Sequence, residues 1–160
     1  MKKHILVLCL SLLALAGCTR QSPEVIQVAA DDKEMNAAME RARGTLEEFW
    51  TKRELQGPAF QGLLKVYFTE GASTDEGEHM WVRVTEHTTD RISGILLSSP
   101  GWLTNVQEGD KVDFPNSRVS DWLYVEDGHS KGAFTVQLLR SRMSAEERRE
   151  HDSGYPFSFD

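Results

Sequence analysis

The chain has almost no cysteine. Only Cys9 and Cys18 occur among its 160 residues, and both lie near the N-terminus. A domain further along the chain therefore contains no disulfide, and its stability has to come from a hydrophobic core. The histidines stand singly, without a cysteine pair or an Asp-rich loop, so the ligand spacing of a metal site is missing as well. We predict no metal and no cofactor.

Positive charge is also scarce. The chain has 18 basic and 25 acidic side chains, which gives a net charge of −7 at pH 7. Such a surface repels the phosphates of nucleic acids and the headgroups of anionic lipids. The composition therefore argues against a nucleic-acid-binding protein and against flat docking on an anionic membrane.

Motifs for catalysis are missing too. No serine stands in a Gly-x-Ser-x-Gly or Ser-x-x-Lys arrangement, and no glycine pattern would cradle a phosphate. The sequence therefore predicts no catalytic residue, which favours a protein without enzymatic activity.

The first residues form a targeting signal. Lys2-Lys3 precede an apolar run from Ile5 to Leu15, which is too short to span a bilayer and ends at Leu15-Ala16-Gly17-Cys18. Basic, apolar and small residues in this order, followed by cysteine, are typical of a bacterial lipoprotein signal peptide. We expect residues 1–17 to be removed, Cys18 to carry lipid such as palmitate, and residues 18–30 to form a tether.

The predicted maturation fixes a location. Loss of Lys2 and Lys3 deepens the net charge from −7 to −9. In enteric-type sorting, an Asp after the lipidated cysteine favours the inner membrane, whereas this chain has Thr19. We expect a lipid-anchored protein of the cell envelope, in the outer membrane and facing the periplasm.

Residues 31–160 are predicted to form a single α+β domain. Asp31 and Glu34 predict the start of an amphipathic helix of about five to six turns, which Gly57-Pro58 ends. Ser144 and Glu147 form a second capping box, which predicts a short helix to about Glu150.

Between these helices the pattern favours strands. Alternating or continuous apolar segments predict strands at 60–69, 79–86, 91–98, 111–114, 119–125 and 133–139. These predicted strands follow one another closely, without helices between them. We therefore expect a curved, mainly antiparallel sheet with the first helix packed on one face. Tyr155, Phe157 and Phe159 alternate, and predict a segment that adds to the edge of this sheet or of a partner's sheet.

Two motifs contain the candidate ligand-binding residues. In the first, His79 lies beside Glu78 and near Trp81, so it could bind a metal ion or shuttle a proton; the structural alternative, which we favour, is a hydrogen bond to a neighbouring backbone group or carboxylate at a strand start. In the second, Asp121 and Trp122 could supply a carboxylate and a stacking surface. The structural alternative, which we favour, is a carboxylate that caps backbone amides beside a core tryptophan.

The order and spacing of six motifs resemble the bacterial family called domain of unknown function 2314 (DUF2314), over roughly residues 31–150. The motifs are Phe68-Thr69, Glu78–Val82, Gly94–Leu96 with Pro100, Glu108–Val112, Ser120–Tyr124 and Gly132–Thr135. The resemblance implies no activity, cofactor or catalytic residue, because none is established for the family.

Three functions are compatible with the sequence. The leading hypothesis is a non-enzymatic outer-membrane lipoprotein whose acidic periplasmic domain binds another protein, for example an immunity-type protein that masks a toxin. The second is a small-ligand binder or an enzyme, with a cleft in which His79, Trp81, Asp121 and Trp122 converge. The third is a structural component of the envelope.

Overall fold

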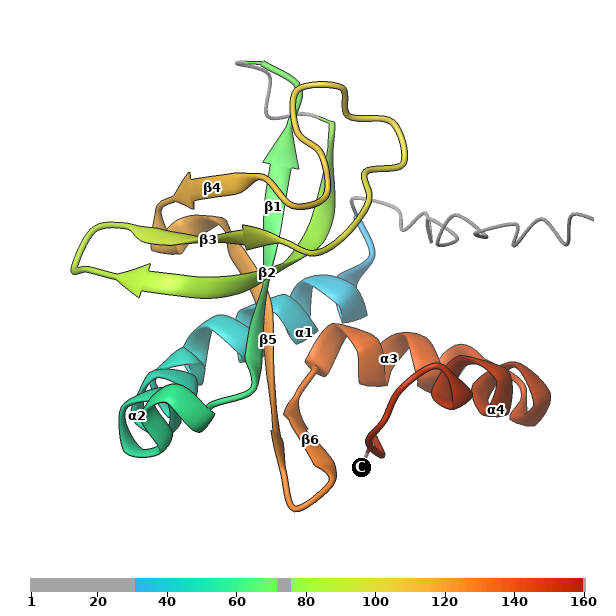
Figure 1. Ribbon diagram of the computed structural model, residues 1–160. Coiled ribbons are helices and arrows are strands. Elements are labelled where there is room, and N and C mark those ends of the chain that lie inside the picture. The colour runs from blue at the N-terminus through green and yellow to red at the C-terminus, as the bar shows by residue number, and fades with distance from the viewer. Residues whose placement is uncertain (1–30, 72–75, 160) are drawn as a thin grey trace, which may run out of the picture.

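The computed structural model describes residues 31–71 and 76–159 (Figure 1). The predicted signal peptide, the predicted lipidation site Cys18 and the predicted tether lie outside the described residues. Within the described ranges, no helix is long and apolar enough to cross a membrane.

The domain is built from helices at both ends of the chain and a sheet between them. In chain order the elements are α1 (Lys33–Gly44), α2 (Leu46–Gln56), the 3-10 turn η1 (Gly57–Ala59), β1 (Gly62–Thr69), β2 (Gly77–His87), β3 (Ile92–Leu96), β4 (Lys111–Phe114), the 3-10 turn η2 (Asn116–Arg118), β5 (Val119–Glu126), β6 (His129–Gly132), α3 (Phe134–Arg142) and α4 (Ala145–Ser153). This confirms the predicted α+β class.

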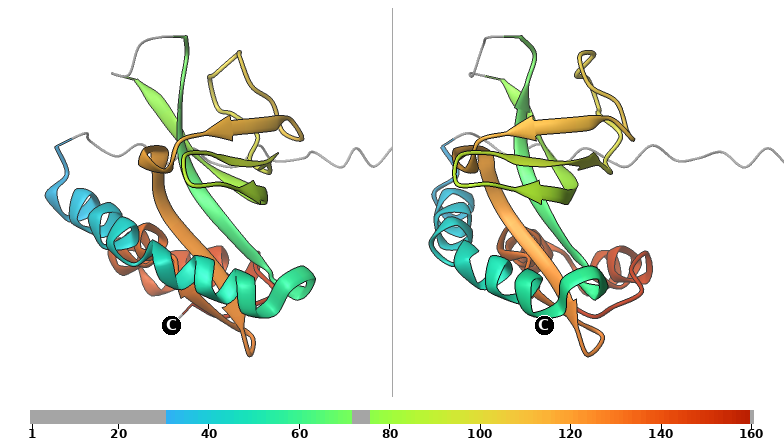
Figure 2. Two further views of the ribbon diagram at one scale, coloured as in Figure 1. Left: turned by 90° about the vertical axis from the view of Figure 1, so that its left-hand side faces the viewer. Right: turned by 60° about the vertical axis from the view of Figure 1, so that its left-hand side comes forward.

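The six strands form one open sheet in the order β4-β3-β2-β1-β5-β6. Every pairing between neighbouring strands is antiparallel, as the sequence predicts. The sheet is strongly twisted, so that β3 and β4 run across the direction of β5 (Figures 1 and 2). α1 and α2 cover one face of β5, and α3 lies on its other side (Figure 2).

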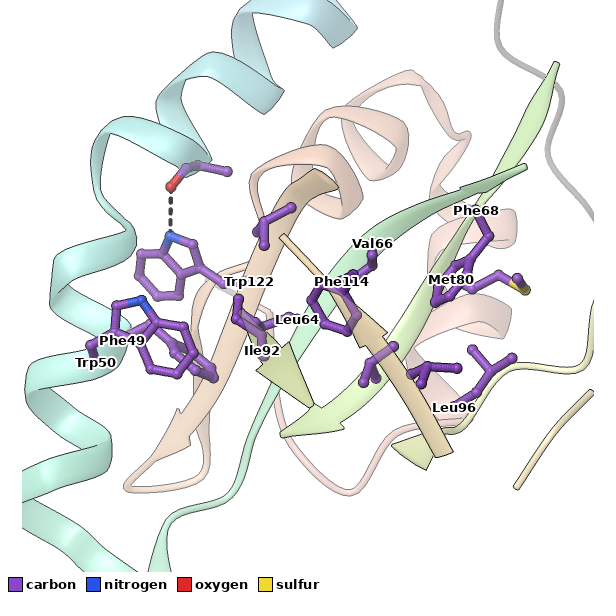
Figure 3. Close-up of a cluster of buried hydrophobic side chains, with 14 of the residues drawn as sticks. Phe49, Trp50, Leu64, Val66, Phe68, Met80, Ile92, Leu96, Phe114 and Trp122 are labelled. Carbon is purple, nitrogen blue, oxygen red and sulfur yellow. Dashed lines mark hydrogen bonds between the residues drawn. The ribbon is translucent and has the colours of Figure 1, made fainter. Parts of the chain in front are cut away.

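The main core lies between the sheet and the first two helices (Figure 3). Leu64 and Val66 from β1 and Met80 and Val82 from β2 point into it, because alternate residues of a strand share a face. Trp122 of β5 is 1% exposed, and its indole N–H donates to the Ala42 carbonyl of α1 at 2.9 Å. Each such buried side chain contributes about 1.5–3 kcal/mol.

The first helix differs from the prediction of one continuous helix. It divides into α1 and α2, because the chain bends at Thr45, whose backbone is not helical. The N-cap is Asp32 and not Asp31, since the Asp32 carboxylate accepts from the amides of Glu34 and Met35. Arg142 at the end of α3 also pairs with Asp32, at 2.6 Å, and together these contacts lower the pKa of Asp32 to about 2.

The predicted strand at 133–139 is wrong. Residues Phe134–Arg142 form the helix α3, and the last strand is β6, which the sequence did not predict. The segment carries aromatic and β-branched residues that favour strands, but its first amides are bonded to a carboxylate of β5. The third predicted strand is also shorter, at Ile92–Leu96.

Both predictions for the C-terminal segment, the capping box and the tail at the sheet edge, are confirmed. Ser144 and Glu147 form the predicted capping box of α4. The tail then pairs with the edge of the domain's own sheet, since Ser130 N–H donates to the Ser158 carbonyl at 2.8 Å. Phe159 packs with Leu123, Ala133 and Val136 in a second, smaller core on the α3 side.

Gly132 and Gly128 offer a matched test of close packing. Both have positive φ angles, of 75° and 80°. A Cβ at Gly132 would overlap the carbonyl oxygen and ring of Trp122, whereas at Gly128 no heavy atom lies within 4 Å. We expect Gly128→Ala to lower the free energy of unfolding by about 1 kcal/mol. Gly132→Ala should cost about 2 kcal/mol more, measured by urea unfolding. Equal losses would show that the close approach to Trp122 contributes nothing.

Candidate functional site

The five predicted ligand-binding residues lie on two different faces of the sheet. On β2, His79 and Trp81 point away from the main core, and Glu78 shares the orientation of the core residue Met80. On β5, Asp121 points to the α3 side and Trp122 lies in the main core. The predicted cleft in which Trp122 joins the other residues is therefore not formed.

A β-bulge at Ser120 sets this division. Lys65 of β1 pairs with Asp121, but the next residue, Val66, pairs with Val119, so Ser120 is an extra residue in β5. In a regular strand Val119 and Asp121 would share a face. The bulge allows Val119 to enter the main core while Asp121 faces α3.

Asp121 caps the N-terminus of α3 from the neighbouring strand. It is fully buried. One carboxylate oxygen accepts from the amides of Trp122 (2.8 Å) and Phe134 (3.1 Å), and the other from the amide (2.7 Å) and hydroxyl (2.6 Å) of Thr135. Ala133, the residue before the helix, is left-handed and has no side chain that could do this. The structural alternative for Asp121 and Trp122 is therefore what the geometry supports.

Lys65 supplies the opposite charge. It lies between Trp81 and Asp121 in the register of β2, β1 and β5. Its ammonium donates to the Thr135 hydroxyl at 3.2 Å and lies 5.4 Å from the centre of the Trp81 ring. Burial lowers the pKa of Lys65, and the charge of Asp121 opposes this effect. The sequence did not indicate Lys65, because a lysine in an alternating strand is ordinarily a solvent-facing residue.

Burial also raises the pKa of Asp121, whereas the hydrogen bonds from Thr135 and Trp122 act to lower it. Four donors are directed at its two oxygens, and all four require acceptors. We infer that the carboxylate is charged at neutral pH and is stabilised by the nearby charge of Lys65, whose ammonium is joined to it through the Thr135 hydroxyl.

His79 completes this polar cluster. Its Nδ1 lies 2.8 Å from the Ser120 hydroxyl, which in turn donates to the Lys65 carbonyl at 3.2 Å. Desolvation, followed by the charge of Lys65, lowers the pKa of His79, although the residue is exposed overall. Ser120 is 2% exposed, and its hydroxyl lies between His79 Nδ1 and the Lys65 carbonyl.

Glu78 organises a different part of the molecule, the long connection between β3 and β4. Its carboxylate accepts from three successive amides, those of Gly101 (2.8 Å), Trp102 (2.7 Å) and Leu103 (3.0 Å). The residue is only 7% exposed, so a buried carboxylate is stabilised entirely by hydrogen bonds to this loop.

Further contacts fix the same loop. Glu70, at the end of β1, accepts from the amide (2.9 Å) and hydroxyl (2.6 Å) of Thr104, and these bonds lower the pKa of Glu70. The side-chain amide of Asn105 (Nδ2) donates to the Thr69 carbonyl at 2.9 Å. Leu103 is inserted into the main core. We call residues 97–110 the braced loop; it projects beside β1 and β2 at one end of the sheet (Figure 1).

The braced loop displays Trp102. This side chain is 47% exposed, and Leu97 at the start of the loop is 37% exposed. Tryptophan is usually mostly buried, so one held outward by a rigid backbone is a candidate recognition residue. The sequence reasoning missed it. The available signal was Pro100-Gly101-Trp102, which places a large apolar residue in a turn.

Two hollows lie away from both motifs. One, of about 390 Å³, is lined by residues including Arg53, Phe60 and Arg83. The other, of about 570 Å³, lies at the C-terminal tail around Asp152 and Tyr155. Among residues 31–71 and 76–159, no group of three or more His, Cys, Asp or Glu side chains could hold a metal ion.

Comparisons with known proteins identify relatives of the chain. The model of a family described as uncharacterized proteins conserved in bacteria (DUF2314) matches residues 32–159. A protein named as an ankyrin repeat protein, from Neisseria meningitidis serogroup B (strain MC58), is 36% identical over 141 residues, which cover 84% of this chain and 56% of that protein. The chain thus spans little more than half of this relative. The uncharacterized protein YegJ of Escherichia coli (strain K12) is 25% identical over 155 residues, covering 94% of this chain and 95% of that protein. No solved structure matches.

The coupling of Asp121 with Lys65 can be measured by a double-mutant cycle. Asp121→Asn should lower the free energy of unfolding by about 3 kcal/mol, because it leaves the first amides of α3 without a charged acceptor and the buried lysine without a nearby negative charge. Lys65→Met should cost less in the Asp121→Asn background than alone, with a coupling energy of about 1 kcal/mol. The control is Asp113→Asn, which breaks an exposed pair with Arg91 and should cost under about 1 kcal/mol. Additive losses in the cycle would contradict the coupling.

Proposed function

We propose a function from the geometry of the chain itself, because the chain belongs to DUF2314, a bacterial family described as uncharacterized. The match over residues 32–159 confirms the resemblance predicted from the motifs. The family description supplies no activity that could be transferred to individual residues.

The proposed function is binding of another protein through the braced loop, with Trp102 as the central contact. The observation that carries it is the hydrogen bonding of Glu78 to the amides of Gly101, Trp102 and Leu103, which holds an exposed tryptophan on a fixed backbone. A loop already ordered before binding loses little conformational entropy on association. Exposed tryptophans on such loops commonly dominate the binding energy of protein interfaces.

The charges around Trp102 indicate the kind of partner. Exposed carboxylates lie in the loop and at the neighbouring ends of β1 and β2, at Glu70, Glu76 and Glu108. The whole chain has a net charge of −7. A partner with an apolar pocket and a basic rim complements this surface, and opposite charge would also speed association.

The anchor and the location complete the proposal. A lipid on Cys18 would hold the domain at the outer membrane, facing the periplasm, and each buried CH₂ of its acyl chains would contribute about 0.8 kcal/mol. An immunity-type protein that masks a toxin is one concrete form of such a module.

Photo-crosslinking tests the proposed contact. A photoreactive amino acid at position 102 should give one discrete protein adduct in cells, and the same residue at position 55 should not. Leu55 is the matched control, since it is 76% exposed on α2. Purified wild-type protein should compete for the adduct, and Trp102→Ala should compete at least about 30-fold less well, the effect of losing one dominant contact. Equal competition by the two proteins would refute the role of Trp102.

Cell fractionation tests the anchor separately. Cys18→Ala should release the protein from the membrane fraction and abolish incorporation of a labelled palmitate analogue, because it removes the acylated thiol. Cys9→Ala, within the predicted signal peptide, is the control and should leave both unchanged. Thr19→Asp should move the protein to the inner membrane. Membrane association of Cys18→Ala equal to that of the wild type would contradict lipid anchoring.

A further inference from the structure

The two edges of the sheet differ in what covers them. At β6 the C-terminal tail adds to the edge, since the Ser158 carbonyl accepts from the Ser130 amide and the Ser158 amide donates to the Gly128 carbonyl. At the other edge β4 pairs with β3, and within residues 31–71 and 76–159 no other segment pairs with its outer side (Figure 1). An uncovered strand edge offers unpaired backbone groups to another strand.

The backbone groups of Lys111 and Asp113 point out of this edge. The Leu96 amide donates to the Asp110 carbonyl at 3.0 Å, so these two opposite residues form a hydrogen-bonded pair that continues the β3–β4 ladder. In an antiparallel ladder such pairs alternate along each strand, so Val112 also turns its amide and its carbonyl towards β3. The flanking Lys111 and Asp113 therefore turn theirs outward, and both residues are exposed.

The two charges at this edge complement each other across a two-fold axis. When two β4 strands lie antiparallel about an axis at Val112, Lys111 of each copy lies opposite Asp113 of the other, because both residues are one position from the axis. Each such pair joins residues whose backbone groups point outward, as a hydrogen-bonded pair requires. Opposite charges at directly opposed positions stabilise a sheet. Charged side chains ordinarily keep sheet edges apart, whereas this order of charges favours one register between two copies.

The side chain of Asp113 is held in place at this edge and that of Lys111 is not. Asp113 accepts from the hydroxyl of Ser93 and from Nε of Arg91, each at 2.8 Å, and these contacts lower the pKa of Asp113. Its side chain is nevertheless 52% exposed, so a further cation can reach the carboxylate. Among the residues that the structure describes, the ammonium of Lys111 has no hydrogen-bond or ion-pair partner. A second copy would supply one.

We propose that β4 of one copy pairs with β4 of a second copy of this chain, so that two domains share one continuous antiparallel sheet. The contact is isologous, because the same four residues act on both sides. So short a strand buries little surface, and we expect weak association in solution. The predicted lipid anchor would confine both copies to one membrane and raise their effective concentration. The contact does not include Trp102.

Cysteine cross-linking in membranes tests the contact and its register together. Two differently tagged full-length copies are expressed together, one with Lys111→Cys and the other with Asp113→Cys. The Cα atoms of a hydrogen-bonded pair lie about 5.5 Å apart, which a disulfide can span, so oxidation should link the two tags. When both copies carry Lys111→Cys, the thiols lie on a diagonal of about 7–8 Å and should link at least about fivefold less. The wild-type chain controls for its own cysteines.

Charge reversal tests the complementarity of the two strands. Lys111→Glu places carboxylates opposite each other and should lower energy transfer between fluorescently tagged copies in membranes by at least about threefold. Asp113→Lys should do the same alone, but a mixture of the two variants should restore the transfer, because each reversed charge then meets its opposite. Lys33→Glu is the matched control, since it makes the same change at an exposed position of α1 and should have no effect. Circular dichroism should show the same fold for all variants.

Several outcomes would overturn the proposal. One is the absence of a link between the two tags, and another is equal linking of the opposed and the diagonal positions, which random collision would give. A link to a different protein would assign the edge to a foreign strand. No recovery in the mixed variants would show that the charges do not face each other. Trp102→Ala should leave the cross-link unchanged, so this proposal and the proposed role of Trp102 can fail separately.

Discussion

The contact on which much of the fold depends is that of Asp121 with the first amides of α3. It joins Asp121 of β5 to a helix that begins 13 residues later, and it does so with a side chain that is completely buried. The desolvation of that carboxylate would be costly, but four hydrogen bonds and the charge of Lys65 offset it. The start of α3, and therefore the second core beneath it, is fixed by this one residue.

The same contact explains which parts of the fold the sequence could predict. The first helical region and five of the six strands could be predicted from local periodicity and composition. The residues that define these patterns, at i, i+3 and i+4 in a helix or at alternate positions in a strand, lie close together in the sequence. The helix α3 could not be predicted in this way, because residues 133–139 favour a strand and the carboxylate that caps the helix comes from β5. The bulge at Ser120 is equally invisible, since nothing in the local pattern shows an extra residue. The break at Thr45 was missed because apolar spacing continues through it.

The two predicted site motifs turn out to share one physical principle. Glu78 and Asp121 are both strand carboxylates that are buried and that bind successive backbone amides of a segment following later in the chain. The pattern of an acidic residue beside an aromatic one therefore identified Glu78 and Asp121, which accept hydrogen bonds from backbone amides. It missed Trp102, the exposed residue in the loop that Glu78 holds. His79, Trp81 and Asp121 do come together, but around Lys65, and the Asp121 carboxylate is fully bonded to backbone and Thr135.

The length of the β3–β4 connection gives the strongest reason to assign function to the braced loop. Two adjacent antiparallel strands need only about two to five residues to connect them, whereas here residues 97–110 intervene. Leu103 is the part of this connection that packs into the main core. The bonds from Glu78 and Glu70 fix the loop's backbone while Trp102 stays exposed, and this arrangement is what the proposed binding role rests on.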